Sequence, residues 1–195
     1  MKNIIIILIT VITSISCKAQ QIVGMDYPIS KAEDYDGKYF KDLDGNYDKF
    51  LGIWENTTGN MTFRVILFKT EKEPFGDPVS FYMDRISGRF LMIENIGTPN
   101  EREVYNSMKY MPNFGTTPEI VISGGAGTTI MSGTIWDNTI TSTILPSGML
   151  NGEMTLEILN IASTPLQARW KVFRKGLSLE GVEFNVPTDI LLTKQ

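Results

Sequence analysis

The chain has 195 residues, of which 42% are hydrophobic and 21% are charged, and its formal net charge is -4. This length and composition predict one ordinary globular domain plus a targeting segment. The mildly acidic balance, without a basic block, excludes the electrostatic footprint of a nucleic-acid-binding protein. The chain has no histidine and a single cysteine. Without histidine, the chain lacks the commonest general base and the commonest metal ligand. A single cysteine excludes an internal disulfide and a cysteine zinc cluster.

The first residues have the pattern of a secretion signal. A short basic start at Lys2 is followed by the run 4–15, which is apolar apart from three hydroxyl residues. This run is shorter than the roughly 20 residues that span a bilayer, and it matches the apolar region of a signal peptide. The only cysteine, Cys17, follows directly after small Ser16.

The stretch Ser14-Ile15-Ser16-Cys17 resembles a lipobox, the processing site of bacterial lipoproteins, with Ser14 in place of the usual Leu. The resemblance implies that residues 1–16 are a lipoprotein signal peptide cleaved before Cys17. It also implies that acyl chains such as palmitate are attached to Cys17, and two or more such chains give a stable membrane anchor. A plain secretory signal that happens to contain a cysteine is the alternative.

Residues 17–49 are expected to be the lipidated cysteine and a flexible polar tether, because acidic residues and lysines alternate there with Gly and Tyr. The stretch Asp42–Asp48 has some of the spacing of a calcium loop. An EF-hand needs glycine at its sixth position and a bidentate Glu at its twelfth, and Tyr47 and Ile53 stand there instead. We therefore expect a solvated turn and no metal site.

Residues 50–195 predict a single all-β domain, because short apolar runs with a period of two are separated by Gly, Pro and Asn. Turns are expected at Ser87-Gly88, at Gly124–Gly127 and at Asp137-Asn138, and an exposed loop at Glu71–Pro78. The expected strands are 51–56, 61–70, 79–85, 89–96, 119–123, 128–136, 139–145, 152–161, 166–174 and 190–193. Tight connections favour antiparallel neighbours. A closed barrel would remove exposed edges, and a two-sheet β-sandwich is the alternative.

Gly52-Ile53-Trp54 resembles the opening strand of lipocalin and fatty-acid-binding barrels, in which a Gly-x-Trp places the Trp across one end of the barrel. The resemblance implies an antiparallel lipocalin-like barrel. A second resemblance covers most of the mature chain. The opening 48–55, the stretch 59–63 and the ending 187–195 resemble an uncharacterised lipoprotein family of flavobacteria and related Bacteroidota, with Ile53 departing from the expected Thr. It implies a compartment and a fold, and no chemistry.

The sequence contains no established catalytic motif. The glycine-rich stretch 124–129 lacks the Gly-Lys-Ser/Thr of a phosphate-binding loop and is expected to be a hairpin turn. Ser107-Met108-Lys109 has the wrong spacing for a Ser-x-x-Lys motif. Glu101 and Glu103 could form a carboxylate pair for glycosidic chemistry, although an exposed loop or edge fits their polar neighbours better. The tryptophans lie in apolar runs and are expected in the core: Trp54, Trp136 and Trp170.

These observations predict a membrane-anchored lipoprotein that is not an enzyme and needs no cofactor. Its partners would be the membrane, through the lipid, and a hydrophobic or small-molecule ligand held by the barrel. The alternative is a structural or interaction lipoprotein of the cell envelope with a protein partner. The start Lys18–Gln21 lacks the acidic run of surface-export signals, which favours the outer membrane facing the periplasm. The ligand-binding residues are not predicted.

Overall fold

The two-residue apolar period of the sequence is realised as strands in the computed structural model, which describes residues 20–108, 121–141, 149–174 and 182–195. Within them the chain is all-β apart from one 3-10 turn, η1 (Ala32–Tyr35). No helix in this described part has the length and apolar character needed to cross a bilayer. The strands are β1 (Gln21–Gly24), β2 (Lys38–Lys41), β3 (Gly52–Thr58), β4 (Met61–Phe75), β5 (Phe81–Glu94), β6 (Arg102–Asn106), β7 (Ile122–Ala126), β8 (Ile130–Thr141), β9 (Met149–Ile158), β10 (Gln167–Arg174) and β11 (Asp189–Lys194).

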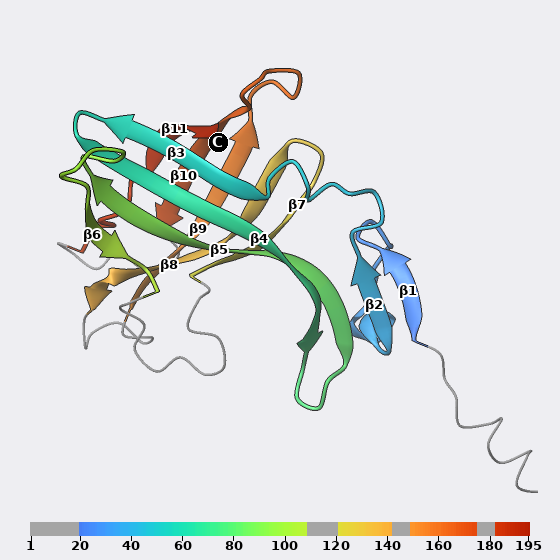
Figure 1. Cartoon of the computed structure of the whole chain (residues 1–195). Coiled ribbons are helices and arrows are strands. Elements are labelled where there is room, and N and C mark those ends of the chain that lie inside the picture. Colours follow the sequence, from blue (N-terminus) through green and yellow to red (C-terminus); the bar gives the residue numbers. More distant parts are fainter. Residues whose placement is uncertain (1–19, 109–120, 142–148, 175–181) are drawn as a thin grey trace, which may run out of the picture. The chain divides into compact units, whose positions relative to one another are not determined.

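Eight of the described strands close into an antiparallel β-barrel (Figure 1). The hydrogen-bonded order is β5-β4-β3-β11-β10-β9-β8-β7, and β7 pairs back onto β5. The short strand β6 pairs with β5 outside this circuit. The predicted antiparallel barrel is therefore confirmed, and the sandwich alternative is not adopted.

The barrel interior is filled by the chain's own side chains. Buried residues occupy alternate positions along the barrel strands, as expected for side chains that point inward. Ten large side chains from the barrel strands are fully buried: Trp54, Leu67, Ile86, Phe90, Ile122, Met131, Ile135, Met154, Leu156 and Trp170. A side chain lining a ligand-sized void would keep accessible area. Around these described residues the interior is therefore close-packed, as protein cores are.

Two of the three tryptophans occupy the predicted core positions. Trp54 and Trp170 are both 0% exposed. The indole nitrogen of Trp54 donates to the carbonyl oxygen of Phe50 at 2.7 Å, and that of Trp170 donates to the carbonyl oxygen of Pro187 at 2.8 Å. Each buried N–H group therefore has a partner. Trp136 on β8 is only half-buried.

Two predicted turns are wrong because their residues lie within strands. β5 continues through Ser87-Gly88, where a Cβ on Gly88 would meet Leu67 Cδ2 at 2.6 Å and the Ile66 carbonyl oxygen at 2.9 Å. This glycine therefore permits close packing of neighbouring strands, and does not mark a turn. β8 likewise continues through Asp137-Asn138, and both side chains are buried.

Two predicted connections are shorter than expected. β4 extends to Phe75, so most of the expected loop Glu71–Pro78 is strand. β7 extends through Gly124 and Gly125 to Ala126, so most of the expected glycine-rich turn is also strand. In both places the ladder to a neighbouring strand outweighs residues that locally favour a turn.

Residues 72–83 form a compact unit with the chain up to Leu43, and the barrel unit comprises residues 44–71 and 84–195. In the first unit, β1 pairs in parallel with β2, and β2 pairs in parallel with the first residues of β5. Five aromatic rings of this unit contact one another around the buried Phe40: Tyr27, Tyr35, Phe40, Phe75 and Phe81. The stretch predicted to be a tether therefore includes two short strands and a turn, and the boundary at residues 49 and 50 stays a prediction.

Lys194 at the end of β11 covers Trp54. Its ammonium nitrogen lies 5.7 Å from the centroid of the Trp54 ring and donates to the carbonyl oxygen of Lys49 at 2.8 Å. Burial lowers the pKa of Lys194, while the nearby charge of Asp48 acts in the opposite sense. The last strand is thus fastened to the segment that leads into the first barrel strand.

We predict that Lys194→Ala lowers the free energy of unfolding by about 1–2 kcal/mol, because it uncovers the Trp54 ring and leaves a backbone carbonyl without its donor. Lys194→Met also loses this donor, but it keeps the apolar cover of the Trp54 ring and removes a partly desolvated charge. Its loss of stability should therefore be less than half as large. Urea unfolding followed by tryptophan fluorescence measures both. Equal losses in the two variants would mean that the charge, and not the cover, stabilises this contact.

Candidate functional site

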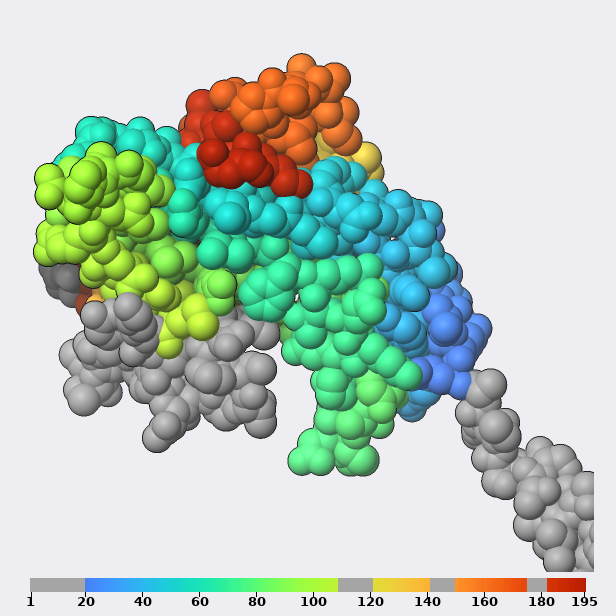
Figure 2. Space-filling view, viewed as in Figure 1, coloured from blue at the N-terminus to red at the C-terminus, as the bar shows by residue number. Residues whose placement is uncertain are grey.

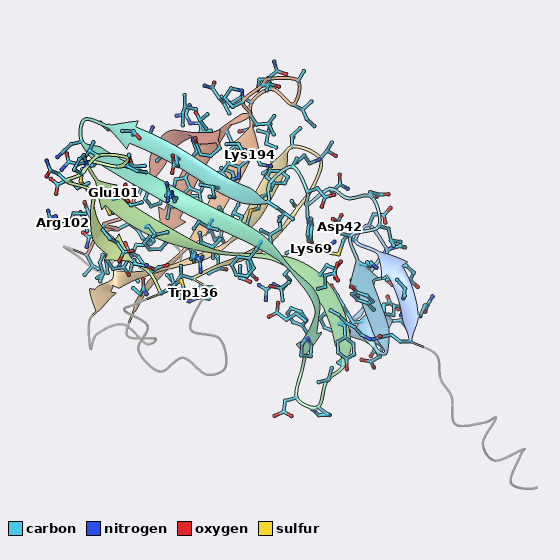
Figure 3. The ribbon with its side chains drawn as sticks, in the orientation of Figure 1. Asp42, Lys69, Glu101, Arg102, Trp136 and Lys194 are labelled. Atoms are coloured by element: carbon cyan, nitrogen blue, oxygen red, sulfur yellow. The ribbon has the colours of Figure 1, made fainter. Side chains whose placement is uncertain are left out.

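The two ends of the barrel differ in the chain segments that close them. The turns 127–129 and 159–166 and the incoming segment 44–51 belong to one end, which we call the sealed end. The opposite end, which we call the loop-bearing end, has the tight turn 59–60 and, among the described residues, the segments 95–108 and 182–188 that follow β5 and precede β11. Figure 3 shows Glu101 and Arg102 at the loop-bearing end and Lys69 toward the sealed end.

Aromatic side chains from the incoming segment close the sealed end. Tyr47 is 1% exposed and Phe50 is 0% exposed. The Tyr47 hydroxyl donates to the backbone oxygen of Asp84 at 3.3 Å. A Cβ on Gly125 would lie 3.1 Å from that hydroxyl oxygen, so the Tyr47 side chain packs closely against β7. The sealed end is therefore packed by the chain itself.

A buried ion pair lies beside Tyr47. The Lys69 ammonium is 3.3 Å from Asp84 Oδ2, and Asp84 is 0% exposed. The same ammonium lies 5.8 Å from the centroid of the Tyr47 ring. Because each charge is balanced inside the barrel, the arrangement resembles a structural closure more than a ligand subsite, and removing one partner would leave an uncompensated buried charge.

Asp137 is the main polar anchor of the loop-bearing end. Its side chain is 0% exposed. Asp137 Oδ2 accepts the backbone N–H groups of Asn185 at 2.8 Å and Val186 at 3.2 Å. Asp137 Oδ1 accepts the backbone N–H of Thr139 at 3.1 Å and its hydroxyl at 2.6 Å. This carboxylate therefore ties the chain leading into β11 to the end of β8.

Asn138 connects a second segment to the same end. It is 1% exposed, and its amide nitrogen donates to the carbonyl oxygen of Ser107 at 2.6 Å. The hydroxyl of Tyr105 on β6 donates to Asn138 Oδ1. The Tyr105 ring stacks on Phe90 with centroids 5.6 Å apart. Tyr105 is half-buried, so it joins the apolar interior to the surface of this end.

The rim of the loop-bearing end is held by an exposed ion pair. Arg102 donates to Glu94 Oε2 from two nitrogens, at 2.5 and 3.1 Å, and Asn60 donates to Glu94 Oε1 at 2.9 Å. Hydrogen bonding from Arg102 lowers the pKa of Glu94. Figure 2 shows β6 and the preceding loop, in yellow-green, on the surface of this end. The rim therefore presents fixed polar groups to solvent.

The carboxylates considered for glycosidic chemistry have separate local partners. Glu101 Oε2 accepts the backbone N–H of Gly97 at 2.7 Å, and Glu103 Oε2 accepts the Asn106 amide at 2.9 Å. Both are exposed. Each hydrogen bond stays within its own loop or strand, as the exposed-edge interpretation predicts.

The other candidate residues are spread over the chain. Ser107 is buried, and its hydroxyl oxygen accepts the backbone N–H of Phe90 at 3.1 Å. Within the Asp42–Asp48 stretch, Asp42 is 7% exposed. Cys17 lies outside the described residues. Among the residues that are described, no group of three or more acidic or cysteine side chains is placed to hold a metal ion.

The sequence analysis missed the two buried acids of the barrel strands, Asp84 and Asp137. Asp84 has the same strand phase as Ile86 and Phe90, and Asp137 has the same phase as Met131 and Ile135. An acid in phase with an apolar stripe points into the core, where it needs partners. That phase relation was a usable signal. The identity of the partners was not, because the pairing of Asp84 with Lys69 on β4 and of Asp137 with the segment before β11 depends on the register of the fold.

A family model described as "Family of unknown function (DUF6705)" matches residues 1–146. No curated protein and no solved structure matches the chain.

We predict that Asp137→Asn lowers the free energy of unfolding by about 2–4 kcal/mol, because an amide nitrogen would face backbone donors and leave them unsatisfied. Asp189→Asn is the matched control, since Asp189 is 47% exposed and pairs with Arg169 on the outer wall. It should cost less than about 1 kcal/mol. Denaturant unfolding measures both, and similar losses would contradict the assignment of Asp137 as the anchor.

Proposed function

This chain belongs to the family of unknown function DUF6705, and we propose that it is a membrane-anchored lipoprotein whose β-barrel is a binding module acting at its loop-bearing end. The family lends it no activity, so the proposal rests on the chain's own sequence and geometry. No catalytic activity is included, because the chain has no histidine and the two candidate carboxylates are engaged separately.

The anchor is supported by the order of features at the start of the chain. Lys2, the apolar run 4–15, small Ser16 and the only cysteine follow one another as lipoprotein processing requires. Acyl chains on Cys17 contribute about 0.8 kcal/mol for each buried CH₂. The proposed location is the outer membrane, with the domain facing the periplasm.

The difference between the two barrel ends is the observation that carries the binding function. Tyr47, Phe50 and Trp54 fill the sealed end and are at most 1% exposed. The opposite end has the described segments 95–108 and 182–188 and a polar rim around Glu94 and Arg102. Binding residues are commonly found on loops positioned by a rigid scaffold, which favours the loop-bearing end.

The packed interior bears on the class of target. A carrier of hydrophobic ligands needs a cavity of several hundred Å³. The fully buried Met131, Met154 and Leu156 point into the barrel from β8 and β9. A small molecule bound at the rim is compatible with this packing, whereas a lipid would find no accessible surface on these described side chains. The second candidate function, an envelope protein that binds a protein partner at the same end, is favoured by the same packing.

The anchor predicts that the wild-type chain fractionates with membranes and carries fatty acid. Cys17→Ser should remove the fatty acid and release the domain from the membrane fraction, because no thiol remains for acylation. Metabolic labelling with a clickable palmitate analogue, followed by membrane fractionation, measures both properties. A wild-type chain without label would contradict the anchor.

The binding end is tested with the mature chain purified gently from its host. Native mass spectrometry should detect a bound small molecule, or crosslinking in cells should capture one discrete protein partner. Arg102→Ala, at the rim, should then reduce the bound fraction several-fold. Arg169→Ala is the matched control, since this arginine also pairs with one carboxylate but lies on the outer wall. Equal effects of the two variants would remove the loop-bearing end from the proposal.

A further inference from the structure

We propose that the unit containing β1 and β2 docks on the bilayer that holds the Cys17 lipid. Docking uses aromatic and apolar side chains at the end of its sheet where β1 begins. The inference rests on the anchor of the proposed function and adds a membrane-contacting surface to it. Its central residues are Tyr35, Phe75, Val79 and Phe81.

The stretch between Cys17 and β1 is too short to hold this unit far from the membrane. Three residues, Lys18, Ala19 and Gln20, separate Cys17 from the first residue of β1, Gln21. Four fully extended steps span at most about 14 Å. The headgroup region on each side of a bilayer is itself roughly 5–8 Å thick. With Cys17 anchored, the start of β1 therefore lies within one strand length of the lipid surface.

Parallel pairing places the starts of three strands together. Gln21 pairs with Lys38, so β1 and β2 begin at the same end (Figure 1). Tyr39 pairs with Tyr82, which brings the start of β5 to that end as well. The backbone N–H of Gly37 donates to the Ser80 oxygen at 2.8 Å, which fixes the turn before β5 beside the turn before β2.

Aromatic and apolar side chains are gathered at this end, beside the exposed carboxylates of Asp36 and Asp77. The Phe75 and Phe81 rings are stacked with centroids 4.9 Å apart, and the Tyr35 and Phe81 centroids are 4.8 Å apart. All three rings are half-buried. Val79, in the turn between β4 and β5, is 50% exposed. Exposed apolar side chains beside tyrosine suit the interface between headgroups and acyl chains.

The charge of the unit indicates the kind of bilayer. The acidic side chains of its described residues are Asp26, Glu33, Asp34, Asp36, Asp42, Glu73 and Asp77, and the basic ones are Lys31, Lys38, Lys41 and Lys72. Seven acidic against four basic groups give a net charge of -3. Anionic lipids attract basic segments, so this acidic unit favours a zwitterionic surface and docks through apolar contact.

Hydrogen exchange on a membrane-coupled chain tests the docking. The mature chain from Cys17 is coupled through its thiol to a maleimide lipid in phosphatidylcholine nanodiscs. The same chain capped with N-ethylmaleimide, mixed with identical nanodiscs, is the reference. Tryptophan fluorescence unfolding first verifies that both samples are folded. Coupling should slow exchange of the amides in 75–81 about tenfold, which corresponds to a tenfold docking equilibrium, and leave the turn 159–166 unchanged.

Two exposed substitutions separate docking from general effects. Val79→Asp should remove at least about two thirds of the protection, because it replaces the exposed apolar side chain of this turn by a further carboxylate, which resists entering the interface. Ile161→Asp, at a residue that is 58% exposed in the barrel unit, should remove none. Adding phosphatidylglycerol should weaken the protection.

Other outcomes would overturn the docking. Unchanged exchange in 75–81 on coupling, or equal effects of the two substitutions, would exclude the membrane surface. Protection that grows with the number of chains per nanodisc would assign the surface to a second copy of the chain. Chemical coupling supplies the anchor in any case. A host-made chain without lipid on Cys17 would therefore contradict the proposed function while leaving the docking result readable.

Discussion

The seam between β5 and β7 closes the barrel, and the rest of the barrel unit depends on it. Among the described residues, three pairs form this seam: Ile86 with Gly124, Ser87 with Ser123, and Gly88 with Ile122. A Cβ on Gly88 would lie 3.3 Å from Ile122 Cβ and closer still to Leu67. Gly88 thus lets β5 pack closely on β4, and Gly124 lets β7 pack closely on β8, where a Cβ would overlap the Ser132 carbonyl oxygen. Without the seam, β5 and β7 would both expose unpaired edges.

Closure at eight strands also sets the chemistry of the interior. A barrel of this size has an interior that side chains can fill, and tryptophan, methionine and leucine fill it here. Acids in phase with that interior must find their partners within the protein. Asp84 does so with Lys69 at the sealed end, and Asp137 does so with backbone N–H groups at the loop-bearing end. Asp137 thereby fastens the segment that leads into β11, whereas Asp84 joins two neighbouring barrel strands.

Much of the architecture was predictable from the sequence. The period of two and the tight connections predict the antiparallel strands, and the β3–β4 hairpin, β9, β10 and β11 lie close to their predicted positions. Local residue preference failed at Ser87-Gly88 and Asp137-Asn138, where strand pairing and burial outweigh turn propensity. The partners of Asp84 and Asp137 could not be predicted from the sequence for another reason. Lys69 and Asp84 are 15 positions apart, and Asp137 contacts Asn185 after 48, so their meeting depends on register that the sequence does not reveal.

A filled barrel changes what a lipocalin-like architecture implies. Where a cavity exists, the fold itself suggests carriage of a ligand, whereas a packed interior leaves only the rim, the connections and the outer wall for recognition. The short distance between Cys17 and Gln21 adds a second restriction. With the proposed anchor, at most about 14 Å of extended chain separates Cys17 from the first strand. A target must therefore come to the membrane surface, which favours a membrane-associated partner or a small diffusible ligand over a distant fixed one.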